Sequence, residues 1–101
     1  MIRNLLHPLP DASQVEVFET LLQLPQLRVE RIVSDGQVSA DWYDQDETEW
    51  VLLLAGAARL LFEGDAADTV LAPGDCVLIE PHRRHKVTYS APGTVWLAVW
   101  A

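Results

Sequence analysis

The chain has 101 residues, half of them apolar, a single cysteine and a formal net charge of −8. This length fits one domain with one compact core, and a lone thiol, Cys76, excludes both an intrachain disulfide framework and a CxxC zinc site. The negative charge disfavours phosphate backbones and anionic lipids, so we expect neither nucleic-acid nor membrane binding.

The location that the sequence favours is the cytoplasm. No apolar run approaches the ~18 residues that a membrane helix needs, and the first residues, MIRNLLHPLPD, are too polar and too broken by proline for a signal peptide. A single free thiol is typical of a reducing compartment.

We expect residues 1–26 to form a short N-terminal arm and residues 27–101 to form the main domain. Pro8 and Pro10 prevent regular structure over the first twelve residues. Ser13 and Glu16 have the spacing of a capping box, which predicts a short helix over 14–23. The alternation of Val15 and Val17 around Glu16 equally allows a strand.

From residue 27 onward, short apolar or alternating runs are separated by turn signals about every ten residues. Asp35-Gly36 is a strong hairpin signal, and the Pro-Gly turn at 73–74 combines a fixed φ with a residue that tolerates positive φ. This spacing predicts an all-β sandwich or barrel. The expected strands are residues 27–33, 37–43, 50–56, 57–63, 68–72, 76–80, 86–90 and 94–100.

Two stretches resemble the two motifs of the cupin superfamily. Glu49 and Gly56 match the E-x6-G half of the first motif, and Pro73-Gly74-Asp75 with Ile79 matches the start of the second. His85 falls on the histidine that binds metal in that family. The resemblance covers about residues 36–100 and implies a cupin jelly-roll β-barrel with a metal held inside by side chains from both motifs.

The chain departs from the family at the histidine pair of the first motif. WYDQ, residues 42–45, stands where H-x-H is usual, and Glu80 stands where the usual proline would lie. With this replacement the chain resembles one branch of small bacterial single-domain cupins. The resemblance lends a fold and leaves the reaction open, so whether the protein is an enzyme is not decided by the sequence.

We take five residues as candidate metal ligands: Glu49, His85, Asp44, Gln45 and Tyr43. Side chains two apart on a strand point to the same face, so Tyr43 and Gln45 can both face inward, whereas Asp44 needs a β-bulge to do so. One nitrogen with two or three oxygens suits a divalent Fe, Mn or Zn ion, and Ni is included as an alternative. Substrate or water would fill the open positions.

Two functions remain open from the sequence. In the first, the protein binds a divalent metal and acts on a small polar metabolite. In the second, it is a non-catalytic binding or sensor module with a degenerate, metal-free site, in which Glu49 and His85 pair and hold a small ligand. Leu52, Leu53 and Leu54 cannot all face one interior, so some of them must be covered from outside, either by the N-terminal arm or by a second copy of the chain. We expect a homodimer in either case.

Overall fold

The structure is a computed structural model and describes residues 2–101. Over these residues the chain is all β, with eight strands and no helix, which confirms the expected fold class. None of residues 2–101 belongs to a helix long and apolar enough to cross a membrane. The strands are β1 (Val17–Leu24), β2 (Leu27–Ser34), β3 (Glu49–Ala55), β4 (Ala58–Phe62), β5 (Thr69–Leu71), β6 (Cys76–Ile79), β7 (His85–Ser90) and β8 (Thr94–Trp100).

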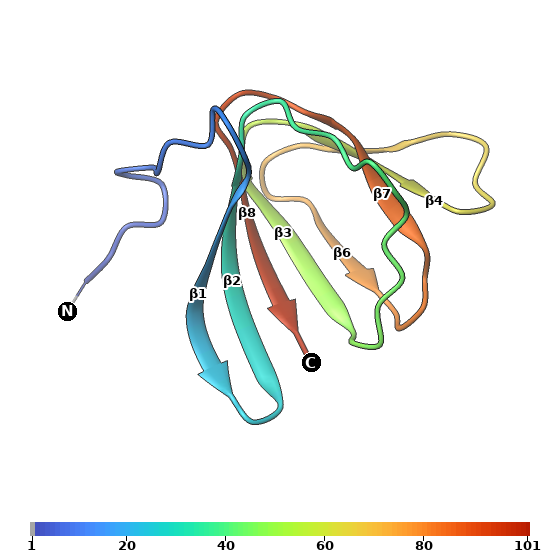
Figure 1. The fold of residues 1–101 in the computed structure, drawn as a ribbon, viewed down its shortest axis with the longest axis horizontal. Helices are drawn as coiled ribbons and strands as arrows, with labels where there is room; N and C mark the ends of the chain where they lie inside the picture. The colour runs from blue at the N-terminus through green and yellow to red at the C-terminus, as the bar shows by residue number, and fades with distance from the viewer. Residues whose placement is uncertain (1) are drawn as a thin grey trace.

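The strands form two antiparallel sheets. The larger has the order β1-β2-β8-β3-β6 and the smaller has the order β5-β4-β7. Figure 1 shows the five strands of the larger sheet side by side, with β4 and β7 at its right-hand side. β2 and β8, the first and last strands of the predicted main domain, pair with each other at seven positions. Segments far apart in the sequence therefore lie side by side in the larger sheet.

The core lies between the two sheets. Ile32, Leu53 and Trp96 occupy opposing register positions on the larger sheet and pack in one cluster with Leu60 and Phe62 of the smaller sheet. Residues paired across a ladder share a face, so these positions mark the inner surface of each sheet. The cavity-facing positions on the strands follow from this alternation.

The helix predicted over 14–23 is wrong, and the strand alternative is correct. Val17–Leu24 forms β1, which pairs with β2 across the two-residue turn at Pro25 and Gln26. Pairing along the whole of β2 satisfies the backbone of β1, and the valines favour an extended chain. Only the residues before β1 remain an irregular arm, and Ala12 from that arm packs on Val33 and Val95 outside the barrel.

The strand predicted over 37–43 is also wrong. Segment 36–48 runs beside β7 with a single isolated bridge, between Tyr43 and His85. Ser39 explains the lost regularity, because its hydroxyl accepts the hydrogen bond of the Val87 N–H in place of a backbone carbonyl. A side chain that bonds to the neighbouring backbone competes with the regular ladder.

Gly56 is the glycine with the least space for a side chain. It has a φ of +87°, and a Cβ at this position would lie 2.6 Å from the Thr94 Cα. Thr94 is fully buried and cannot move aside. The turn between β3 and β4 therefore requires glycine for two independent reasons, backbone conformation and space.

We predict that Gly56→Ala lowers the free energy of unfolding by about 3 kcal/mol, combining the left-handed backbone cost with overpacking. The matched control is Gly64→Ala, which shares the positive φ of +93° but has open space around the added methyl group. Urea unfolding of both variants separates the two contributions. Equal losses in the two variants would show that the contact with Thr94 is unimportant.

Candidate functional site

A cavity of about 120 Å³ lies between the two sheets. Its lining is mostly apolar and aromatic, with a few polar groups from the segment before β3, from β3 and from β7, and it includes no lysine or arginine among the described residues. The lining residues are Glu16, Phe18, Ile32, Tyr43, Gln45, Glu49, Val51, Leu60, Ile79, His85, Val87, Trp96 and Trp100. An apolar cavity with a few converging polar groups is the usual form of a small-molecule site.

Glu49 and His85 face each other inside this cavity. Glu49 begins β3, where its backbone pairs with Ile79 and Trp100, and His85 begins β7, where it pairs with Phe62. His85 Nε2 lies 3.8 Å from Glu49 Oε1, and both side chains are more than nine-tenths buried. This separation is too long for a hydrogen bond, so the two groups flank a position that an atom of a ligand can share.

His85 is oriented from behind. Its Nδ1 lies 2.8 Å from the carbonyl oxygen of Arg83. A carbonyl only accepts, so Nδ1 carries the proton and donates it. In the neutral ring Nε2 is then an acceptor that points toward Glu49. The Tyr43 ring, 5.6 Å from the His85 ring between centroids, lies beside it.

Burial raises the pKa of Glu49 to about 7. Water is excluded around the carboxylate, and Glu30 and Glu47 raise the pKa further, while the Gln45 hydrogen bond and Arg28 oppose the rise. A carboxyl group that titrates near neutral pH exchanges a proton readily under working conditions. Such a perturbed acid in a cavity marks a functional position.

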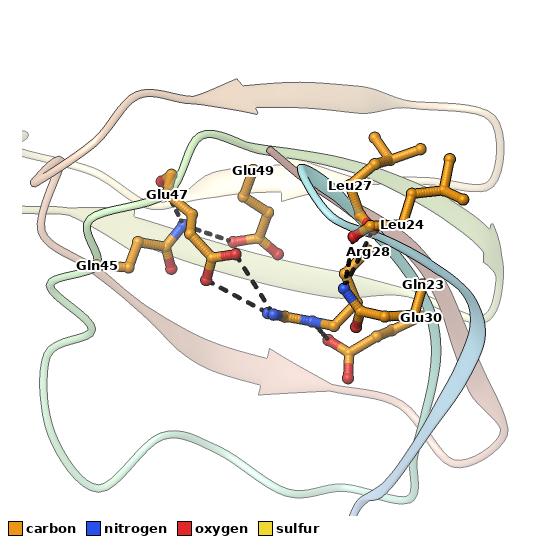
Figure 2. A network of polar contacts seen from close by, with 8 residues as sticks. All are labelled: Gln23, Leu24, Leu27, Arg28, Glu30, Gln45, Glu47 and Glu49. Atoms are coloured by element: carbon orange, nitrogen blue, oxygen red, sulfur yellow. Dashed lines mark hydrogen bonds and ion pairs between the residues drawn. The ribbon is translucent and has the colours of Figure 1, made fainter.

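A polar network, shown in Figure 2, holds the segment before β3 against β2. Gln45 Nε2 donates to Glu49 Oε1 at 3.3 Å and lies 3.4 Å from the carbonyl oxygen of Glu47. The Glu47 carboxylate accepts from both terminal nitrogens of Arg28, whose Nε lies 3.4 Å from Glu30. The network therefore holds Gln45 in the position from which its amide hydrogen-bonds to Glu49.

The structure brings four of the five candidate ligands to the cavity: Glu49, His85, Gln45 and Tyr43. Asp44 lies elsewhere, because its Oδ1 contacts Nδ1 of the exposed His82 at 2.7 Å and the residue does not line the cavity. Gln45 therefore faces the cavity and Asp44 does not. Neighbouring side chains of the WYDQ segment that point in opposite directions account for this, and no β-bulge at Asp44 is needed.

Two cavity residues were missed from the sequence. Glu16 was interpreted as part of a helix cap, and Phe18 received no role, yet both line the cavity from the start of β1. The Glu16 carboxylate accepts a hydrogen bond from the Ser34 hydroxyl of β2. The strand interpretation of this segment places residues 16 and 18 on one face, which is the signal that would have found them.

The donors do not fit a closed metal centre of three or four protein ligands. Over residues 2–101, no group of three or more His, Cys, Asp or Glu side chains is placed to hold a metal ion. The remaining donors are the His85 imidazole and the Glu49 carboxylate, with the neutral amide of Gln45 and the phenol of Tyr43 beside them. Such a pair can give a two-point attachment and no more, so we assign no reaction step to a metal.

Solved structures resemble this chain, whereas no protein-family model and no curated protein matches it. A Ralstonia eutropha JMP134 protein, described as a candidate mannose-6-phosphate isomerase, is 40% identical, with a TM-score of 0.94, over 100% of this chain and 97% of its own. An RmlC-like cupin protein from Desulfovibrio desulfuricans is 17% identical with a TM-score of 0.83, over 100% of this chain and 95% of its own.

KdgF from Halomonas sp. is 18% identical with a TM-score of 0.77, over 90% of this chain and 83% of its own. At these low identities the second and third structures show the fold alone. Together with the two antiparallel sheets, they confirm the expected jelly roll.

The buried acid predicts a specific pH dependence of stability. In the unfolded chain the Glu49 carboxyl has its ordinary pKa of 4.5, whereas in the folded chain its pKa is about 7. Between these values the folded state binds more protons, so this group's contribution to stability is complete below about 4.5 and falls as the pH rises to about 7.

Glu49→Gln lacks this ionisation. Its free energy of unfolding relative to the wild type should therefore rise by on the order of 3 kcal/mol between pH 4 and pH 8. Urea unfolding of both proteins over this range measures the difference, in which the other titrating groups cancel. A difference independent of pH would mean that the Glu49 carboxyl titrates at its ordinary value.

Proposed function

We propose that this chain, which shares the fold of solved cupin structures, is itself a cupin whose barrel binds a small molecule, and that Glu49 and His85 hold the polar group of that molecule. The 3.8 Å gap between His85 Nε2 and Glu49 Oε1, inside an otherwise apolar cavity, is the observation that carries this proposal. Within residues 2–101, the Glu49 carboxylate accepts only the hydrogen bond from Gln45, and the His85 ring uses only Nδ1, so Nε2 and part of the carboxylate are open to a ligand. A polar group between the two residues can form hydrogen bonds that the described residues do not supply.

The same arrangement supports proton transfer. Glu49, with a pKa of about 7, is available near neutral pH both as an acid and as a base. His85 Nε2 accepts a proton, and the Arg83 carbonyl then faces an imidazolium that it continues to hydrogen-bond through Nδ1. The site is therefore suited to moving a proton on a bound metabolite, whether or not turnover follows.

The activity of the similar Ralstonia eutropha protein does not transfer directly. A hexose phosphate needs cations or a cluster of N–H donors for its phosphate, and the described lining of this cavity contains no lysine or arginine. Arg28, which influences Glu49, is already engaged by Glu30 and Glu47. We therefore favour a ligand without a phosphate.

A second candidate function is binding of a divalent metal by Glu49 and His85. One observation favours it: Nδ1 of His85 is anchored on a carbonyl and Nε2 is free, as in most metal-ligating histidines. The 3.8 Å separation also resembles the span across one ion with bonds of about 2.0–2.2 Å. Water or substrate would complete such a site, which Gln45 and Tyr43 would supplement weakly.

We predict that ligand-observed NMR with a library of small molecules finds binders to the wild type, and that Glu49→Gln with His85→Gln weakens them at least tenfold. Loss of two hydrogen bonds from the polar group gives this magnitude. Glu80→Gln is the matched control, since Glu80 is exposed and lies outside the cavity lining. Binders that are insensitive to the double variant would contradict the assigned polar site.

Elemental analysis of protein purified without chelator or affinity-tag metal distinguishes the two candidates. Near-stoichiometric metal that disappears in Glu49→Ala with His85→Ala would favour the second. If no metal is retained after loading with Fe(II), Mn(II), Zn(II) and Ni(II), the second candidate is excluded and the metal-free site stands.

We also propose that a second copy of the chain covers the outer face of the larger sheet. Trp50 and Leu78 are paired and exposed there, and Leu52, Leu97 and Val99 lie around them on the same face. These five side chains, the outer apolar patch, are all uncharged. Two molecules of charge −8 repel over most of their surface, so an uncharged patch related by a two-fold axis is the favourable contact between them.

Leu78→Arg should convert the dimer into a monomer, because two buried like charges would meet across the axis. The control is Val70→Arg, which changes an equally exposed apolar residue on the smaller sheet. Sedimentation equilibrium at micromolar concentrations measures both. A monomeric wild type, or a dimer that survives the substitution at Leu78, would refute the proposed interface.

A further inference from the structure

The charge and chemistry of the cavity also indicate what kind of molecule it selects. We infer that the ligand is a small cationic amine with an apolar body, in preference to a neutral or anionic molecule of the same size. This inference rests on the proposed binding function and adds the ligand class to it. Four independent features of the lining support it: charge, acceptor geometry, aromatic content and size.

The first feature is charge. The lining contains two carboxylates, Glu16 and Glu49, and no lysine or arginine among the described residues. The cation nearest to this network, Arg28, contacts Glu30 and Glu47 and stacks on the Trp100 ring at 5.0 Å. Arg83 meets His85 through its carbonyl, while its guanidinium faces Phe62 and Asp65. No free positive charge therefore balances the cavity acids, and an anion would be repelled.

The second feature is the kind of hydrogen-bonding atom that is left free. The proton of His85 Nδ1 is donated to a carbonyl, so the neutral ring presents an acceptor at Nε2. Glu49 presents carboxylate oxygens, and the amide donor of Gln45 is already directed at Oε1. When Glu49 is ionised, its Oε1 and His85 Nε2 are two acceptors 3.8 Å apart that one donor can contact together. Trp100 Nε1, a buried donor of the lining without a partner among the described residues, can accommodate an acceptor elsewhere on the ligand. An ammonium group has three donors and can contact both acceptors at once.

The third feature is the aromatic content of the walls. Trp96, which is buried, and Trp100, which is partly buried, line the cavity together with the two acids, and the more exposed Phe18 and Tyr43 also contribute to the lining. Aromatic faces attract cations through the ring quadrupole, with tryptophan the strongest, and the interaction strengthens when water is excluded. Tyr43 is beside His85, so one of these rings is at the polar end of the cavity. A neutral ligand gains the apolar contact without this attraction.

The fourth feature is size. The cavity measures about 120 Å³, somewhat less than the ~150 Å³ of an apolar protein cavity that accommodates benzene. The ligand body is therefore a short alkyl chain or one small ring. Glu16, which is half-buried directly before β1, adds negative charge to this part of the lining. Larger sugars and phosphorylated metabolites do not fit both the volume and the charge.

The test compares ligands that differ only in their charged group: butylamine, 1-butanol and butyrate, and the parallel set benzylamine, benzyl alcohol and benzoate. Dissociation constants are measured on the full chain at about pH 7.5 from shifts of the Trp96 and Trp100 indole signals. We expect one or both amines to bind at least tenfold more tightly than the matched alcohol, and the carboxylates to bind more weakly than the alcohol.

Two isosteric variants and one control sharpen the result. Glu16→Gln should reduce amine binding about five- to tenfold and leave alcohol binding within about twofold. Glu49→Gln should weaken both classes, with the amines losing at least fivefold more than the matched alcohols, whereas Glu80→Gln should change neither. Alcohols that bind as tightly as amines, or carboxylates that bind best, would overturn the inference and leave cavity binding intact. If no member of either series shifts the cavity signals, both the inference and the proposed function fail.

Discussion

The buried carboxyl of Glu49 is the constraint around which the rest of the cavity is arranged. An ionised acid inside an apolar core is strongly unfavourable unless hydrogen bonds or charges compensate it. Here the compensation is partial: one amide hydrogen bond from Gln45 and a distant arginine leave the pKa near neutrality. The protein therefore keeps a group that is costly for folding at the position where it can act on a ligand, as functional sites often do.

The support for that acid comes from a chain of contacts that reaches the surface. Arg28 joins Glu30 on its own strand to Glu47 on the segment before β3, and the backbone of Glu47 in turn lies beside the amide of Gln45. Gln45 belongs to the WYDQ segment, which stands where the motif that the chain resembles has two histidines. The amide of Gln45 stabilises the ionised form of Glu49 without adding charge, which explains why the site remains acidic and lacks a third strong metal donor.

Much of the barrel could be predicted from local patterns, and the failures have physical causes. Turn residues and alternation located seven of the eight strands, because turn chemistry and side-chain alternation are local properties. The start of the chain was ambiguous, since capping-box spacing and strand alternation coincided at Glu16, and only pairing with β2 decides between them. Segment 37–43 has the composition of a strand, yet the Ser39 hydroxyl replaces a ladder bond. The resemblance to the cupin motifs indicated inward positions for Glu49 and His85. The sequence left open whether Asp44 or Gln45 faces the interior, because the contact of Asp44 with His82 depends on tertiary structure.

The irregular attachment of segment 36–48 has a consequence for how the cavity exchanges its contents. Three backbone hydrogen bonds connect this segment to β7, at Ser39 and Tyr43, whereas β2 and β8 are paired at seven consecutive positions. Local opening is least costly where a wall has few backbone bonds. Tyr43 and Gln45 are on this wall, so its outward movement removes two lining side chains while the larger sheet stays intact. Such an opening would have to break the Arg28–Glu47 contacts and the bond from the His82 N–H to the Gln45 carbonyl, but no strand pairing of the larger sheet.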